Sequence, residues 1–166
     1  MRTYFRSLVA AAAVAAAVVT GGLAAAGPAS AAPKETPIRG LTIYNSTLAT
    51  FGDHDFCRGT VAARFTSPKR GITRLTLTSN GFIGNGAGWK KNPTCRVLVI
   101  ASQTSATALY RDIFIPAAFG AKRGQTVTRD IRTGSGLAQL AVAPYAANNP
   151  VRVPQGSGFT AYLLVP

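Results

Sequence analysis

The chain has few of the residues that enzymes use for acid–base or nucleophilic catalysis. Its 166 residues include five acidic residues, one histidine and two cysteines. A Ser-His-Asp arrangement would have to use His54, and Gly134-Ser135-Gly136 has the composition of a turn, not of a nucleophile elbow. A carboxylate pair for glycoside hydrolysis would have to come from Glu35, Asp53, Asp55, Asp112 and Asp130. We therefore expect no enzymatic activity, and keep a hydrolase using His54 with Asp53 or Asp55 as an alternative.

The chain also lacks long apolar runs, except for one near its N-terminus. Arg2 and Arg6 precede an apolar stretch over residues 8–26, and Gly27-Pro28 and the small residues Ala29-Ser30-Ala31 follow it. This order is typical of a secretory signal peptide. We expect residues 1–31 to be removed and residues 32–166 to form one domain, secreted or associated with a bacterial cell surface. Retention as a membrane anchor is the alternative, because the stretch is nearly long enough to span a bilayer.

Cysteine occurs only twice, as Cys57 and Cys95. An even number of cysteines in an exported domain predicts a disulfide. Closing a loop of this length stabilises a fold by about 4 kcal/mol in the chain-entropy model. Two free thiols or metal ligands are the alternative, and we expect neither a metal nor another cofactor.

Acidic residues concentrate at one place only, Asp53-His54-Asp55. In an extended segment the two carboxylates would point the same way, as two ligands of a cation should. A calcium or zinc site needs more ligands than this segment offers. We interpret it as a polar turn whose carboxylates pair with neighbouring cations such as Arg58.

Strand patterns dominate residues 32–166. Leu75-Thr76-Leu77-Thr78 alternates apolar and polar residues, which predicts a strand with one face buried and the other exposed to solvent. Val97-Leu98-Val99-Ile100 is apolar throughout, which is typical of a central strand covered on both faces. The remaining strands are expected at 38–48, 58–66, 109–115, 126–132, 137–145 and 159–165.

Short strands separated by turn residues predict an all-β fold, an antiparallel two-sheet sandwich of about eight strands with one disulfide. It would be immunoglobulin-like only in the broad sense. The immunoglobulin motif itself is absent, because Trp89 lies only six residues before Cys95 and Pro93 stands where a tyrosine would.

Successive antiparallel strands place their connections alternately at the two ends of a domain. The longer connections, at 49–56, 84–94, 116–125 and 146–158, then share one end, which we call the loop end. The shorter connections, at 67–71, 103–107 and 133–136, share the other, which we call the turn end. Cys57 and Cys95 both fall at the loop end, where they could meet.

Positive charge is the strongest compositional feature. Without Arg2 and Arg6 the chain keeps sixteen Lys and Arg residues against five acids, a net charge of +11. Grouped cations with few acids attract anionic polymers. We expect the loop end to contact an anionic cell-envelope polymer or an acidic protein surface. The binding residues expected there are Lys90, Lys91, Lys122, Arg123, Arg152 and Trp89.

Two further interpretations of the loop end remain open. Trp89 could instead fill space in the core beside the disulfide. The chain could also be a secreted inhibitor or accessory protein that presents the segment 84–94 to another exported protein. We see no motif for specific nucleic-acid recognition and no transmembrane span after removal of residues 1–31.

The alanine-rich N-terminal segment and a body in which Arg outnumbers Lys give the chain a recognisable composition. In this it resembles the small exported single-disulfide β-sandwich proteins of actinobacteria. The resemblance is one of composition and implies export from a bacterial cell.

Overall fold

The computed structural model describes residues 35–41 and 46–166. The expected signal peptide, residues 1–31, lies outside the described residues. Residues Ala32–Pro166 belong to one compact unit. Within the described part of the chain, no helix has the length and apolar character needed to cross a membrane.

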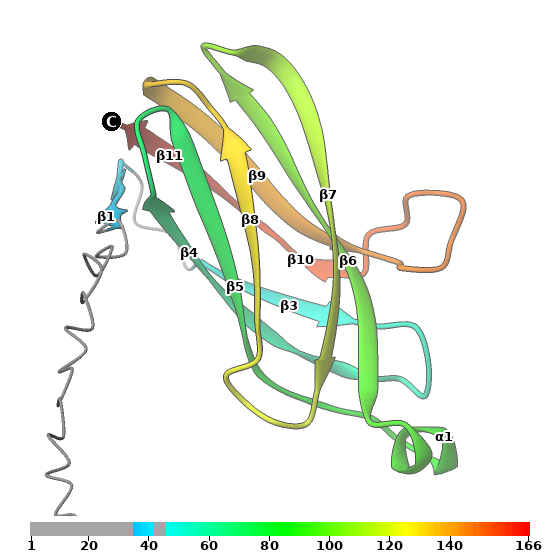
Figure 1. Cartoon of the computed structure of the whole chain (residues 1–166). Helices are drawn as coiled ribbons and strands as arrows, with labels where there is room; N and C mark the ends of the chain where they lie inside the picture. Colours follow the sequence, from blue (N-terminus) through cyan, green and yellow to red (C-terminus); the bar gives the residue numbers. More distant parts are fainter. Residues whose placement is uncertain (1–34, 42–45) are drawn as a thin grey trace, which may run out of the picture. The chain divides into compact units, whose positions relative to one another are not determined.

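Two antiparallel sheets make up the domain (Figure 1). Sheet A has the strand order β10-β3-β4-β5-β8, with β1 paired to β4, and sheet B has the order β2-β11-β9-β6-β7. Sheet A contains β1 (Thr36–Pro37), β3 (Thr47–Phe51), β4 (Arg58–Ser67), β5 (Ile72–Ile83), β8 (Thr126–Arg132) and β10 (Gly156–Ser157). Sheet B contains β2 (Arg39–Gly40), β6 (Thr94–Ser105), β7 (Ala108–Gly120), β9 (Gly136–Tyr145) and β11 (Phe159–Val165). A short helix, α1 (Ala87–Lys91), lies between β5 and β6.

This architecture confirms the predicted all-β, two-sheet antiparallel sandwich. The described residues hold eleven strands, of which eight have five residues or more and three have two. Seven of these eight longer strands lie where strands are predicted, and β3 overlaps the expected strand 38–48 only at residues 47–48. The two-residue strands β1, β2 and β10 pair at the margins, where a sequence pattern has too few residues to show.

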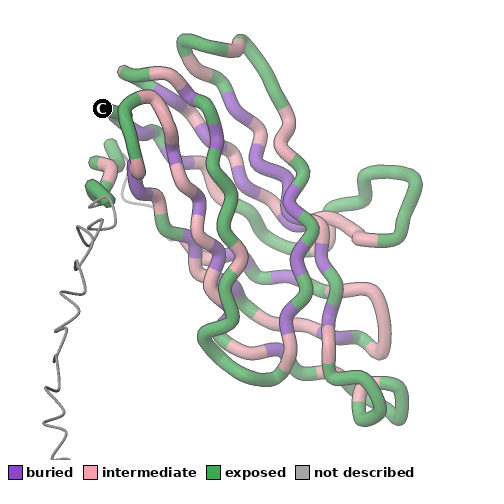
Figure 2. Tube along the Cα trace, in the orientation of Figure 1, coloured by how far each residue is buried: buried purple, intermediate pink, exposed green. Residues whose placement is uncertain are grey.

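The core forms where the inner faces of the two sheets meet. Leu75 and Leu77 of β5 are fully buried, whereas Thr76 and Thr78, which alternate with them, are only partly buried. The same alternation along the other strands is visible in Figure 2 as buried segments interrupted by exposed ones. The largest fully buried side chains are Phe82, Phe119, Leu48, Leu75, Leu77, Leu140 and Leu163. Rings of Phe82 and Phe119 stack across the interface at 5.5 Å, so each sheet buries its apolar face against the other.

The apolar segment 97–100 lies in β6, an inner strand of sheet B, and is covered on both faces as expected. Val97 and Val99 face the core, and Ile100 on the opposite side is only 3% exposed. Ile100 pairs with Phe114 of β7, and the guanidinium carbon of Arg152 lies 4.8 Å above the Phe114 ring. Arg152, from the segment 146–155, therefore covers this part of the outer face of sheet B.

The connections alternate between two ends, as predicted. The turn end carries the short connections at 68–71, 106–107 and 133–135, and the loop end carries those at 52–57, 84–93 and 121–125. In Figure 1, α1 and the loop 121–125 lie at the same end of the domain.

Strand boundaries differ from the prediction most clearly at two places. The expected strand 38–48 is divided into β2 and β3, with residues 42–45 outside the described residues, and β3 continues to Phe51. The expected strand 109–115 extends to Gly120 as β7, through Pro116. Because β7 is an edge strand, Pro116 can occupy it without removing a hydrogen bond from the interior of the sheet.

Candidate functional site

Three loops are bound together at the loop end. The backbone N–H of Asn85 donates to the carbonyl of Asp55 at 2.8 Å, which joins the loop 84–93 to the loop 52–57. Thr94 pairs with Gly120, so the loops 84–93 and 121–125 meet at neighbouring strand ends. A Cβ added to Gly81 would lie 2.9 Å from the carbonyl of Ala121, so the third loop also packs on β5. The loop end is therefore one connected surface.

The predicted disulfide fastens the two sheets at this end. Cys57 directly precedes β4 of sheet A, and Cys95 belongs to β6 of sheet B. Both residues are fully buried, with Cα atoms 5.8 Å apart. The backbone of Gly52 lies against the bridge, since an added Cβ would stand 2.1 Å from Sγ of Cys95 and 2.6 Å from Sγ of Cys57. Only glycine allows the chain to pass this close.

His54 is held by acceptors on both sides of its ring. Nδ1 lies 2.8 Å from Oδ2 of Asp55, and Nε2 lies 2.9 Å from the carbonyl oxygen of Thr94. A carboxylate and a carbonyl can only accept, so both ring nitrogens must donate. The hydrogen bond to Thr94, followed by that to Asp55, raises the pKa of His54 above its usual value.

This arrangement favours the imidazolium form of His54. A general base needs a ring nitrogen with a lone pair directed at the proton that it removes. Here both nitrogens are directed at groups of the protein itself. The geometry therefore gives no support to the alternative of a hydrolase that uses His54 with Asp53 or Asp55.

Asp53 holds β6 through Arg96. Its Oδ1 accepts the backbone N–H of Arg96 at 2.9 Å, and its Oδ2 accepts Nε of the same residue at 2.7 Å. Partial burial raises the pKa of the Asp53 carboxyl, but the hydrogen bonds from Arg96 outweigh this effect, so its pKa lies below the usual range. The sequence interpretation of a paired polar turn is correct in kind, but Arg96 and His54 are the partners, not Arg58.

Asp53 also lies near the disulfide sulfurs. Its carboxylate and the sulfur atoms of Cys57 and Cys95 fall within 4.8 Å of one another, a spacing that could hold a metal ion. The two sulfurs are bonded to each other, and no described cysteine is free. A disulfide offers no thiolate ligand, so this group does not form a metal site.

The turn His54–Cys57 has an unusual backbone. Its two central residues, Asp55 and Phe56, have φ angles of 47° and 51°, and the N–H of Cys57 donates to the carbonyl of His54 at 2.8 Å. Turns with two left-handed central residues normally contain Asn-Gly. For a bulky residue the left-handed conformation costs roughly 1–2 kcal/mol. The turn nevertheless keeps Phe56 at this position with its ring exposed.

Four of the expected binding residues are cations at the loop end. Lys90 and Lys91 form the last turn of α1, and Lys122 and Arg123 lie in the loop 121–125. All four are exposed, and within the described residues none forms a salt bridge. The aliphatic part of Arg123 packs near Gly81, where an added Cβ would lie 3.3 Å from its Cγ.

Trp89, the only tryptophan of the chain, is half-buried. It belongs to α1, packs against the core, and lies close to Gly84, where an added Cβ would be 2.7 Å from its Cγ. Its ring centroid is 6.1 Å from that of His54. One part of Trp89 therefore anchors α1 to the domain, as the packing alternative expected, while the rest remains accessible.

Arg152 does not lie with the other four cations. Its Nη1 lies 2.5 Å from Oδ2 of Asp112, and its guanidinium covers Phe114. Asp112 is eight residues before Gly120 along β7, which corresponds to about 26 Å in an extended strand. Counting strands placed the segment 146–158 at the loop end. Its first part does lie beside the turn 52–57, where Nδ2 of Asn148 is 3.5 Å from Oδ2 of Asp53, but Arg152 reaches back along β7. The grouping of Arg152 with Lys90, Lys91, Lys122 and Arg123 is therefore corrected.

All five acidic side chains of the chain are paired with a basic side chain. Glu35 and Asp130 pair with Arg74, Asp53 with Arg96, Asp112 with Arg152, and Asp55 with His54. Of the fifteen Lys and Arg residues that the structure describes, three form these pairs and the other twelve have no salt bridge to another described residue. The acidic residues are used internally, and the cationic excess faces solvent.

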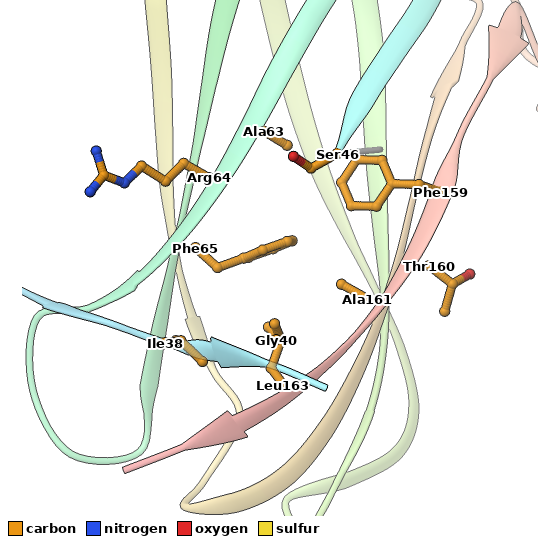
Figure 3. Close-up of a pocket in the computed structure, with 10 residues that line it drawn as sticks. All are labelled: Ile38, Gly40, Ser46, Ala63, Arg64, Phe65, Phe159, Thr160, Ala161 and Leu163. Atoms are coloured by element: carbon orange, nitrogen blue, oxygen red, sulfur yellow. The ribbon is translucent and has the colours of Figure 1, made fainter. Parts of the chain in front are cut away.

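A cavity of 380 Å³ opens on another side of the sandwich, between β4 and β11. Phe65 and Phe159 face each other there, edge to face at 6.2 Å, and Arg64 extends away from the two rings (Figure 3). The lining includes Gly40 and Ser46, which flank residues 42–45. Because that connecting segment lies outside the described residues, the cavity supports no functional assignment.

The sequence pointed to the cations of the loop end but not to the apolar side chains beside them. Phe51 and Phe56 carry no local signal, because their neighbourhood depends on strand register and on the unusual turn. The only local indication of an apolar contact is that Phe51 and Phe56 stand on either side of Asp53-His54-Asp55 in the sequence. No protein-family model matches this chain, and neither a curated protein nor a solved structure matches it.

Proposed function

We propose that this protein is an exported binding module whose loop end contacts anionic components of a bacterial cell envelope. Lys90, Lys91, Lys122 and Arg123 supply the charge, and the disulfide holds the surface that carries them. The protein would act by binding and not by catalysis. This function accounts for a basic composition in a small, rigid β domain, since loops on such a scaffold commonly carry binding sites.

The observation that carries the proposal is the internal use of every carboxylate. At the loop end, Asp53 is held by Arg96 and Asp55 by His54, so neither compensates the nearby lysines. At the turn end the charge is mixed, because Asp130 pairs with Arg74 and Lys69 is close enough to lower the pKa of Asp130 further. A cluster of cations without acidic neighbours attracts anions most strongly.

The test is the affinity of the domain 32–166 for heparin, as a polyanion probe, over a series of salt concentrations. The domain contains the complete described core and the disulfide. One variant carries K90A, K91A, K122A and R123A. The matched control carries R39A, R64A, K69A and R70A, which removes the same charge from exposed positions elsewhere.

We expect steep salt dependence in the wild-type domain, because each contact to a polyanion releases counterions. The loop-end variant should lose most of this slope, and the control should keep it. An equal loss in both variants would contradict the proposal, since it would mean that the charge acts diffusely. A salt-independent 1:1 complex with another exported protein would favour the accessory-protein alternative.

A further inference from the structure

Three exposed apolar side chains gather at the loop end, on the outer side of sheet A. Phe51 ends β3 and Ile83 ends β5, and both pair in register with Arg58, the first residue of β4. The ring of Phe56 lies 5.2 Å from that of Phe51, and the guanidinium carbon of Arg58 lies 5.0 Å from the Phe56 ring centre. Phe51, Phe56 and Ile83 are 40%, 60% and 58% exposed. We call these three residues the apolar patch.

The apolar patch is held rigidly in an exposed position. Phe56 occupies the left-handed turn, which is fixed by the disulfide at Cys57 and by the contacts of Asp55 with His54 and Asn85. Strained backbone of this kind persists only where the surroundings enforce it, and it occurs often at functional sites. A side chain that is already ordered loses little conformational entropy when it binds.

Basic side chains accompany the apolar patch at the loop end. Arg58 stands between Phe51 and Ile83, and Lys90 and Lys91 follow from α1, which packs against the turn. This packing is close, since a Cβ on Gly88 would lie 2.1 Å from Oδ2 of Asp55. The loop end therefore combines exposed phenylalanine and isoleucine with Arg58, Lys90 and Lys91, and its two carboxylates are already engaged.

This combination matches one kind of partner better than a soluble polyanion. A polyanion pairs with the lysines but offers no apolar phase for Phe51, Phe56 and Ile83. A bilayer rich in anionic phospholipid offers both, because apolar side chains enter the boundary between headgroups and acyl chains while Lys and Arg contact the phosphates. Charge complementarity and exposed apolar side chains on one surface thus point to the same partner.

We propose that the apolar patch docks the loop end onto an anionic phospholipid bilayer, with Arg58, Lys90 and Lys91 against the headgroups. The inference rests on the anion contact of the proposed function and adds an apolar contact to it. In the docked state Phe56 and Ile83 leave water, and Trp89 on α1 comes close to the membrane surface.

The test uses the domain 32–166 and vesicles of phosphatidylcholine, with and without an equal part of phosphatidylglycerol. The patch variant carries Phe56→Asn, which tolerates the left-handed turn, and Ile83→Thr, which keeps a β-branched residue in the strand. The matched control carries Leu109→Thr and Leu137→Thr, two exposed apolar residues near the turn end. Circular dichroism and the thermal midpoint establish that each variant is folded.

We expect the wild-type domain to sediment with the anionic vesicles, and brominated lipid to quench the fluorescence of Trp89. The patch variant should bind these vesicles roughly tenfold more weakly or worse, because it loses buried apolar groups, while its heparin affinity stays unchanged. The control should bind as the wild type does. Lys90→Ala with Lys91→Ala should weaken binding to both vesicles and heparin.

Two outcomes would overturn the inference. If the wild-type domain binds heparin but not anionic vesicles, the proposed function survives, and the patch would serve an acidic protein partner instead. If the patch variant binds vesicles as strongly as the wild type, the membrane contact is electrostatic alone. Loss of heparin binding by the loop-end cation variant tests the proposed function separately, so failure of one does not imply failure of the other.

Discussion

At the scale of single residues, His54 shows how contacts redefine a side chain. From its sequence neighbours it was a candidate base or ligand. In the fold, one ring nitrogen faces Asp55 and the other faces the carbonyl of Thr94. The residue thereby ties the turn 52–57 to the beginning of β6, and its charged form is the one that satisfies both bonds.

The stability of the domain should depend on the charge of His54. Because the pKa of His54 is raised in the folded state, its contribution is fully present below the unfolded value of about 6.5 and is lost as pH rises through the folded value. The urea midpoint of the wild type should therefore fall from pH 6 to pH 8.5 relative to that of His54→Gln. Parallel pH profiles for the two proteins would contradict this. A proton NMR titration of the single histidine should show a midpoint above 6.5.

At the scale of elements, the segment 146–155 illustrates a connection that strand counting cannot place. It leaves β9 toward the loop end, and a bridge between Tyr145 and Pro154 then folds it back. Arg152 fastens it to β7 through Asp112 and Phe114. Asp112 also accepts the hydroxyl of Ser102 at 2.7 Å, so this carboxylate joins β6, β7 and Arg152 on the outer face of sheet B.

Removing this fastening should loosen the segment without affecting anion binding. Arg152→Ala leaves the largely buried carboxylate of Asp112 with fewer donors. Since Arg152 itself is more than half exposed, we expect a loss of only about 1 kcal/mol in the free energy of unfolding. The amide of Ala146, which donates to Val153, should exchange faster with solvent. Arg64→Ala, an exposed cation without a described salt bridge, is the control and should change neither quantity.

Retained binding to heparin in Arg152→Ala would agree with its position away from Lys90 and Lys122. A loss of salt slope as large as that caused by Lys122→Ala would instead restore Arg152 to the binding surface.

At the scale of the whole molecule, charge repulsion opposes the compact state. Twelve described Lys and Arg residues have no salt bridge to a described residue, and the five carboxylates are all engaged. Interactions between exposed charges weaken with salt, whether they attract or repel. Because repulsive pairs outnumber attractive ones here, screening should be a net benefit.

The thermal midpoint of the domain should therefore rise when sodium chloride is increased from low to physiological concentration. We expect a rise on the order of 3 °C, which corresponds to about 1 kcal/mol for a domain of this size. Differential scanning calorimetry at constant pH measures it. A decrease in the midpoint would mean that the surface ion pairs of Arg74 stabilise the domain more than repulsion among the excess cations destabilises it. The loop-end variant should show a smaller rise than the wild-type domain.

Much of the fold follows from local patterns. The alternation at 75–78 and the apolar run at 97–100 predict buried strands because side chains on a strand alternate between two faces. Because the connections of successive antiparallel strands alternate between the two ends of the domain, Cys57 and Cys95 are expected at the same end. The disulfide forms there. The predicted strand 109–115 stops before Pro116, whereas β7 continues to Gly120. A proline is tolerated in an edge strand, and only the sheet order makes β7 an edge.

The candidate site also contains residues that the sequence predicts and residues that only the fold brings together. Lys90, Lys91, Lys122 and Arg123 were predictable because each pair adjoins turn residues in a connection. The apolar patch was not, since Phe51 and Ile83 are 32 positions apart and meet only across the register with Arg58. The partners of Asp53, Asp112 and His54 depend likewise on contacts between distant segments.

The sequence by itself determined the strand periodicity, the two-sheet class, the disulfide and the excess of positive charge, because each depends on residue type and spacing along the chain. The tertiary structure alone decided that every carboxylate is engaged, that Arg152 turns away from the loop end, and that Phe56 is held exposed beside Phe51 and Arg58. These features depend on strand register and loop direction, which result from the packing of residues far apart in the chain.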